Sequence, residues 1–316
     1  MSDVSVQLGF YVERPYGNAF SEEEKGRIRK KGFEAIKRIN NLCNKHNISR
    51  TFFILGDYLE QAYRTLGELK GEGILREIFE TDNTMVDIGQ HAYSHRPFLE
   101  IPTRPDKESL TPSEIDLELR NTSNLIFYIL GREAIGLGTP CGYSGGLKHI
   151  SDEAQMAIYI NGIKYISSDL RDSKHGLNPP LFEDGQIRQP YPLWGKGIIE
   201  IPSHGWQDNV FTGTSSTKGV KGYPKTVEDI AEHYIGLIKE GIEASKENKE
   251  TDEKGGKNGK KIYLSFCMHP WAIVEYDLNL DVLESIVSFS LDNGVKVQGY
   301  KQAFMGMRES LAKKDR

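Results

Sequence analysis

The alternation of short apolar segments with longer amphipathic ones is the feature that most constrains the fold of this chain. Residues 4–12 alternate apolar and polar side chains with a period of two, as a strand does, and Thr51–Leu55 is a short apolar run closed by Gly56. Further apolar segments lie at 84–88, 134–138, 163–167, 197–201, 261–267 and 295–298. Helical patterns lie between them, after Ser21 and at 57–80, 112–131, 151–161, 226–246 and 281–293. This order predicts an α/β fold with mainly parallel strands, closed or nearly closed into a barrel.

The chain shows no internal repeat and no clear domain boundary. Its 316 residues would fit two average domains, but (β/α) barrels of this length are commonly single domains. We therefore expect one barrel domain over residues 1–316. Two segments interrupt the alternation: the proline-containing stretch 171–196, and the charged, glycine-rich stretch 245–261, which we expect to be a flexible surface insertion.

Composition and charge exclude several classes of partner. The net charge of −5, from 40 basic and 45 acidic residues, argues against nucleic acid or an anionic membrane as a partner. The three cysteines form no CxxC pair, which suits free thiols in a reducing compartment. The first residues lack a signal-peptide pattern, and no apolar run reaches the roughly 18 residues of a membrane span. We expect a cytoplasmic protein.

Two histidines four residues apart, His91 and His95, follow the predicted strand at 84–88. On a helical turn, this spacing would place both imidazoles on one side, where they could bind one divalent ion. Barrel enzymes place their catalytic residues at this end of their strands. The spacing alone, however, arises more often from surface or packing histidines.

The motifs around these histidines occur in an ordered series. Thr51–Gly56 (TFFILG) and Asp87–His95 (DIGQHAYSH) are followed by the blocks Leu110–Ile115, Gly131–Arg132, Thr139–Pro140, Gly162–Ser168 and Cys267–Pro270. In this series the chain resembles the polysaccharide deacetylase family (carbohydrate esterase family 4) over about residues 4–305. The resemblance implies a distorted (β/α) barrel, a divalent ion such as zinc held by one carboxylate and two histidines, and hydrolysis of an N-acetyl or related amide.

By this resemblance, His91 and His95 are metal ligands, and the first strand should end with two aspartates, a base and a third ligand. Aligned on Phe10, this chain has Glu13 at the ligand position and Tyr11 at the position of the base. A phenol with a pKa of about 10 is a poor base, although it could hydrogen-bond a substrate oxygen. Gly138 stands where the family has an arginine that orients the base. We therefore expect the base and its arginine to be lost together, leaving an altered catalytic base.

The resemblance implies a general acid at the end of a late strand. His269 occupies that position, and a histidine can protonate a leaving amine near neutral pH. Asp208 and His204, in the block Ile199–Asp208, are candidates to supply the acid–base function that Tyr11 lacks, with packing in a loop as the alternative for both. Asp169 falls in another matched block, and its role stays open between catalysis and structure.

Four residues are predicted to bind substrate. Trp206 and Trp271 could stack on a sugar or heterocycle ring, whereas Trp194 is expected to pack. Pro140 and Tyr143 belong to the segment whose backbone N–H groups form part of the oxyanion site in the family.

The leading hypothesis is a metal-dependent hydrolase of a C–N amide bond, an N-deacetylase or deformylase-like enzyme, with an altered base. The first alternative is a cytosolic cyclic-amide hydrolase acting on allantoin-like or imide substrates, which the family also contains. The second is a non-catalytic barrel that binds a carbohydrate or metabolite. In each case we expect a small-molecule or saccharide ligand and no nucleic-acid or membrane partner. Barrels of this family often associate, and the sequence leaves a homo-oligomer open.

Overall fold

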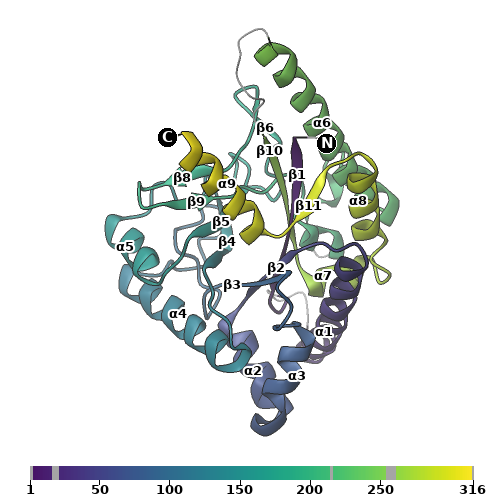
Figure 1. Ribbon diagram of the computed structural model, residues 1–316. Coiled ribbons are helices and arrows are strands. Elements are labelled where there is room, and N and C mark those ends of the chain that lie inside the picture. The colour runs from purple at the N-terminus through teal and green to yellow at the C-terminus, as the bar shows by residue number, and fades with distance from the viewer. Residues whose placement is uncertain (1–2, 16–20, 214–215, 254–260, 315–316) are drawn as a thin grey trace.

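Helices and strands alternate along the chain, and the strands form a curled, mainly parallel sheet with helices on its outside (Figure 1). The computed structural model describes residues 3–15, 21–213, 216–253 and 261–314. The predicted fold class, a distorted (β/α) barrel, is confirmed. Within the described residues, no helix has the length and apolar character needed to cross a membrane.

One sheet contains nine of the strands, in the order β10-β1-β2-β3-β4-β5-β9-β8, with β11 also paired to β1. Its pairings are parallel except for that of β8 with β9, and β6 and β7 form a separate antiparallel pair. The strands are β1 (Val4–Val12), β2 (Arg50–Ile54), β3 (Val86–Gln90), β4 (Gly136–Ser144), β5 (Tyr165–Arg171), β6 (Phe182–Glu183), β7 (Gln186–Ile187), β8 (Tyr191–Leu193), β9 (Ile198–Glu200), β10 (Ile262–Met268) and β11 (Lys296–Gln298).

The α-helices are α1 (Glu22–Lys45), α2 (Gly56–Leu66), α3 (Glu68–Ile78), α4 (Pro112–Leu125), α5 (Asp152–Ile160), α6 (Val227–Glu253), α7 (Pro270–Tyr276), α8 (Asp281–Asp292) and α9 (Tyr300–Lys314). A π-helical turn, η1 (Ile126–Leu130), continues α4, and η2 (Asp208–Thr212) and η3 (Ser216–Gly219) are short 3₁₀ helices. Local sequence explains several of the ends. Ser21 with Glu24, and Thr111 with Glu114, form capping boxes that begin α1 and α4.

Two predicted elements differ from the structure, and two helices were not predicted. The pattern at 57–80 is two helices, because Gly67 adopts a φ of 79° that ends α2 before α3 begins. The helix predicted at 226–246 continues as α6 to Glu253, so the first part of the charged stretch 245–261 is helical and not an irregular insertion. Residues 254–260 of that stretch lie outside the described residues. Helices α7 and α9 lie where the sequence predicts no element.

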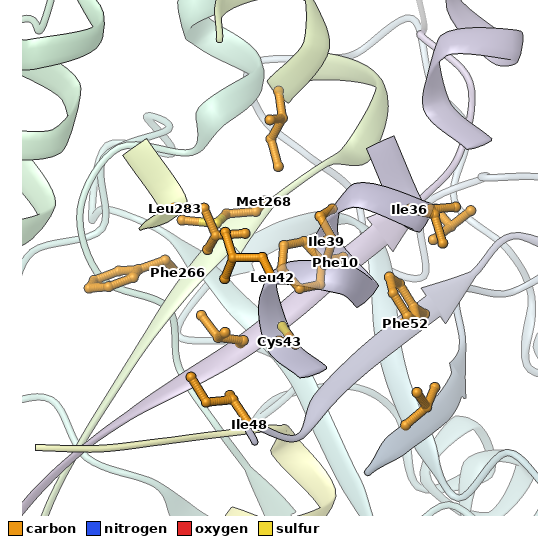
Figure 2. Packing of buried hydrophobic residues seen from close by; sticks show 14 of the residues in the cluster. Phe10, Ile36, Ile39, Leu42, Cys43, Ile48, Phe52, Phe266, Met268 and Leu283 are labelled. Carbon is orange, nitrogen blue, oxygen red and sulfur yellow. The ribbon is translucent and has the colours of Figure 1, made fainter. Parts of the chain in front are cut away.

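Strand β1 is buried on both of its faces, although its alternating sequence predicts one polar face. Its apolar residues Val4, Val6, Leu8, Phe10 and Val12 belong to the large cluster between the sheet and the outer helices. Figure 2 shows part of this cluster, in which Ile39 and Leu42 of α1 lie close to Phe10 of β1 and Met268 of β10. The opposite face carries Tyr11 and points into the barrel.

The barrel interior is filled mainly by aromatic side chains and is closed at one end by α9. Tyr11, Phe53 and Tyr165 meet Tyr300 and Phe304, which α9 contributes. The backbone N–H of Tyr300 donates to the Thr51 hydroxyl near the start of β2, so α9 covers the amino ends of the strands. The carboxyl ends of the parallel strands are therefore at the opposite end of the barrel.

An irregular segment, Ile201–His204, lies between β5 and β10 and closes the barrel where no regular strand does. On one side, Ser203 N donates to Asp169 O of β5 (3.0 Å), and on the other His204 N donates to Ser265 O of β10 (2.8 Å). We call Ile201–His204 the closing segment.

Glu200, at the end of β9, links the closing segment to β5 through a buried carboxylate. Its Oε1 accepts from the backbone N–H groups of Ser168 (2.7 Å) and Asp169 (2.9 Å), and its Oε2 accepts from the Ser168 hydroxyl (2.5 Å). Burial, and next the neighbouring Asp169 carboxylate, raise the pKa of Glu200 to about 8.

This raised pKa predicts that Glu200 makes the fold less stable as pH rises. The folded state binds the proton more tightly than the unfolded state, whose pKa is near 4.5, so the stabilisation is full below that pH and is lost as pH rises to about 8. Glu200→Gln stays neutral and can keep both backbone hydrogen bonds, so its stability relative to wild type should increase across this window. Urea unfolding at a series of pH values measures the difference. The exposed Glu133→Gln is the control, and an identical pH dependence in Glu200→Gln and wild type would contradict the assignment.

Candidate functional site

A cavity of about 180 Å³ opens at the carboxyl ends of the strands. Each part of its wall follows from the parallel sheet: Glu13 comes directly after β1, His91 directly after β3, and His269 directly after β10. Strand β4 contributes Thr139, and β5 contributes Arg171. Residues hundreds of positions apart in the chain meet here because parallel strands end at one edge.

Glu13, His91 and His95 form a buried cluster whose ligand atoms all lie within 4.8 Å of one another. Glu13 Oε2 is 3.1 Å from His91 Nε2 and 2.8 Å from His95 Nε2. Burial opposes ionisation of the carboxyl group, but His95 and His91 hold the pKa of Glu13 well below its usual value. Among the described residues, this is the one group of three or more such side chains close enough to share an ion.

The two histidines do not lie on a helical turn, so that prediction is wrong. They belong to a loop after β3 in which Ala92 (φ 55°) and His95 (φ 64°) have left-handed backbones. This folded loop turns the His95 ring back to within 5.1 Å of the His91 ring, measured between ring centroids.

The surroundings of the cluster suit a divalent ion. The other ring nitrogen of His91, Nδ1, is 2.7 Å from the carbonyl oxygen of Gly138, which as an acceptor requires the proton on Nδ1 and leaves Nε2 with its lone pair towards Glu13. The side chain of Cys141 adjoins that of His95. A carboxylate and two imidazoles, one of them held by such a backbone acceptor, are a common ligand set for zinc and related metals.

Tyr11 and Gly138 fit one another. A β-carbon at position 138 would lie 2.6 Å from Tyr11 Cε1 and 2.9 Å from Phe53 Cγ, so the tyrosine ring occupies the space that a longer side chain at 138 would need. The Tyr11 hydroxyl donates to Ser167 Oγ (2.8 Å), and burial raises its pKa well above the usual value. The ring and the glycine are therefore sterically coupled, and Tyr11 is held as a neutral phenol that donates a hydrogen bond.

His269 and Asp208 form a buried pair beside the cluster. His269 Nδ1 lies 2.6 Å from Asp208 Oδ1, and the His269 backbone N–H donates to Asp208 Oδ2 (2.7 Å). The other ring nitrogen, Nε2, lies 3.6 Å from Glu13 Oε1. Because the pair fixes the proton on Nδ1, Nε2 is the atom that faces the cavity with a lone pair or a second proton.

Of the four residues predicted to bind substrate, one lines the cavity and three lie outside its lining. Trp271 lines the cavity. Trp206 does not, since it packs edge-on against Tyr223 with 5.6 Å between ring centroids, and Pro140 and Tyr143 are also outside the lining, where their neighbours Thr139 and Cys141 stand instead. The Tyr143 hydroxyl accepts from Phe98 N (2.6 Å).

His204 and Asp169 have structural partners. His204 Nε2 lies 2.9 Å from the carbonyl oxygen of Arg188, its Nδ1 accepts from Ser265 N (3.2 Å), and burial lowers its pKa to about 4. Asp169 pairs with Arg188 at 2.7 Å. Neither lines the cavity. Trp194 packs, as predicted, against a second cluster of buried apolar residues, which includes Leu147 and Ile198.

Sequence reasoning overlooked the cationic and amide side chains of the wall. These are Arg104, Lys107, Arg171, Gln207 and Asn209. For Arg171 a signal existed, because it lies two residues beyond Asp169, which falls in a matched block. Arg104 and Lys107 lie in an irregular stretch whose sequence carries no comparable signal.

Comparison with known proteins gives a family match over part of the chain and a fold shared over nearly all of it. The family model described as polysaccharide deacetylase matches residues 32–156. A sequence search of curated proteins finds no match. A protein described as a polysaccharide deacetylase, from Mycobacterium smegmatis, superposes with a TM-score of 0.61 at 14% identity, covering 98% of this chain and 91% of that one.

Two further structures share the fold. One is described as a polysaccharide deacetylase from Pseudomonas aeruginosa PAO1 (TM-score 0.55, 12% identity, 96% of this chain and 90% of that chain). The other is an allantoinase (TM-score 0.55, 11% identity, 96% and 90%).

The fit between Tyr11 and Gly138 predicts that Gly138→Ala destabilises the protein by about 1–3 kcal/mol, through overpacking against two buried rings. The free energy of unfolding from chemical denaturation measures the effect. Gly236→Ala is the matched control, since a β-carbon there meets nothing within 4 Å and should leave stability unchanged or higher. Combining Gly138→Ala with Tyr11→Ala should give less than the sum of the two losses, and full additivity would contradict the contact.

Proposed function

We propose that this chain, whose residues 32–156 match the polysaccharide deacetylase family model, is a metal-dependent hydrolase that removes an acyl group from a small N-acyl amine. The observation that carries the proposal is that Glu13, His91, His95 and His269 line one cavity, and that Asp208 pairs with His269 behind the wall. A ligand set and a proton carrier at this distance are the two parts that amide hydrolysis requires.

We propose zinc as the metal, held by Glu13, His91 and His95. A divalent ion there would supply Lewis acidity, polarising the amide carbonyl and making water a better nucleophile. The carbonyl oxygen of Gly138 holds the His91 ring in its ligand orientation.

His269 is proposed to carry the proton in both halves of the reaction. Tyr11 cannot accept it, so Nε2 of His269 takes the proton from the attacking water, and the oxygen of that water bonds to the acyl carbon. The C–N bond then breaks, and the same Nε2 delivers the proton to the departing nitrogen. Asp208 orients the ring and stabilises its cationic form between the two transfers.

A cyclic amide is the second candidate substrate. The cavity of about 180 Å³ is small for a polymer, and Trp271 offers an aromatic wall for a flat ring. Opening a cyclic amide breaks the same C–N bond with the same proton transfers. A non-catalytic binder is the third candidate, and turnover of any amide by the metal-loaded protein would eliminate it.

Metal content tests the ligand set. Purified protein reconstituted with zinc should hold about one ion per chain, and His91→Ala should lose most of it, since one ligand of a three-residue site is gone. Elemental analysis after dialysis makes the measurement. His149→Ala removes an exposed histidine outside the cavity and should keep the metal. Equal metal content in wild type and His91→Ala would remove the basis for the metal site.

The role of His269 predicts a separate pattern. His269→Ala should lower kcat by about 10²–10⁴-fold while the zinc content stays near one per chain, because the histidine moves protons and is not a ligand. Asp208→Asn should also lower kcat, with KM little changed. Steady-state kinetics on N-acetyl amines and cyclic ureides, with metal measured on the same samples, give the result. Wild-type kcat in His269→Ala would overturn the assignment.

A further inference from the structure

We infer that the substrate carries an anionic group, a carboxylate or a phosphate, which binds Arg171 together with Arg104 and Lys107 at the mouth of the cavity. The inference rests on the proposed function and narrows its substrate class. It starts from the charges of the wall, where these three cations face one carboxylate, Glu13. That carboxylate is already engaged by two histidines.

The local excess of positive charge runs against the composition of the chain. The protein as a whole has 45 acidic and 40 basic residues. The wall of the cavity, with three cations, therefore has a more positive charge balance than the chain as a whole. Arg104 has an exposed partner, Asp106, at 3.4 Å, which compensates part of its charge. An anion entering the cavity would be attracted by the remaining positive charge of the wall.

Arg171 supplies the strongest argument because its charge has no ionic partner in the described part of the chain. Its Nε lies 3.0 Å from the carbonyl oxygens of Cys141 and Gly142, and its Nη1 donates to His175 O (2.7 Å). These neutral acceptors hold the guanidinium plane in place and leave its charge uncompensated. A guanidinium fixed in this way is suited to paired hydrogen bonds with a carboxylate or phosphate.

Elsewhere, the protein pairs its buried arginines with acids. Arg188 lies 2.7 Å from Asp169, and Arg50 lies 2.6 Å from Glu80. Arg171, which is partly buried, breaks this pattern at the wall of the cavity. We expect an anionic group of the ligand to pair with Arg171 in place of an acidic side chain.

Two polar atoms in the same wall independently indicate a bound ligand. Thr139 is 1% exposed, and its hydroxyl has no hydrogen-bond partner among the described residues; the side-chain oxygen of the neighbouring wall residue Asn209 is buried and equally unpartnered. Leaving such buried polar atoms without a partner is unfavourable. A polar ligand in the cavity would satisfy them.

Matched pairs of probes test the inference by binding as well as by turnover. N-Acetylglycine is compared with N-acetylglycinamide, and N-acetylglucosamine 6-phosphate with N-acetylglucosamine. Isothermal titration calorimetry on zinc-loaded protein should show the anionic member of at least one pair binding about 10- to 100-fold more tightly. The pair that shows the preference identifies carboxylate or phosphate as the group recognised.

Variants separate the cations from the metal as the source of any preference. Arg104→Gln combined with Lys107→Gln should reduce the preference about tenfold, and Arg171→Gln should reduce it further, while binding of the neutral probe changes little. Arg132→Gln is the control for Arg171→Gln, because Arg132 also donates to backbone carbonyls but lies outside the cavity. Arg64→Gln is the control for Arg104→Gln, as an exposed arginine paired with an acid.

The outcomes distinguish this inference from the proposed function. Equal binding of charged and neutral probes, or a preference that survives in the Arg104/Lys107 and Arg171 variants, overturns the inference even if amides are hydrolysed. A preference that depends on these cations supports it even if no amide is hydrolysed, in which case the proposed function fails on its own.

Discussion

Burying the Glu13 carboxylate is the constraint on which the site depends. A carboxylate with so little contact with water needs opposite charge or strong donors nearby, and here His91 and His95 supply them. The sheet makes this arrangement available, because β1 and β3 flank β2 and end at the same edge. His269 reaches the same point from β10, the other neighbour of β1. The order of the strands thus places His269 beside the cluster of Glu13, His91 and His95.

Much of this could be predicted from the sequence where the signal is local. Strand β1 and the helix starts at Ser21 and Thr111 follow from side-chain alternation and capping chemistry, and the structure has them where predicted. The two tryptophans show where such reasoning ends. Trp206 and Trp271 both suited a substrate wall, but Trp206 packs against Tyr223, a partner in a separate loop that no local pattern reveals. The left-handed turn that brings His95 back to Glu13 is also set by tertiary contacts, and a spacing of four residues suggested a helix instead.

Tyr11 and Gly138 are two residues that depend on one another for their packing. Strands β1 and β4 are not neighbours in the sheet, so the two residues meet across the barrel interior. A small residue on one strand admits a large ring from the other, and the interior stays filled without a buried charge. The sequence indicated that both positions were unusual, and the close approach of the ring to the glycine gives the physical reason.

The closing segment has a consequence for the chemistry. It is held between β5 and β10 by scattered hydrogen bonds and not by a continuous ladder, and the chain that leaves it reaches Asp208 four residues after His204. Asp208 in turn determines how the His269 ring is held. The hydrogen bonds that hold the closing segment therefore also affect how the His269 ring is oriented. A substitution that weakened the hydrogen bonds of the closing segment, far from any substrate atom, would change the orientation of the His269 imidazole before it unfolded the protein.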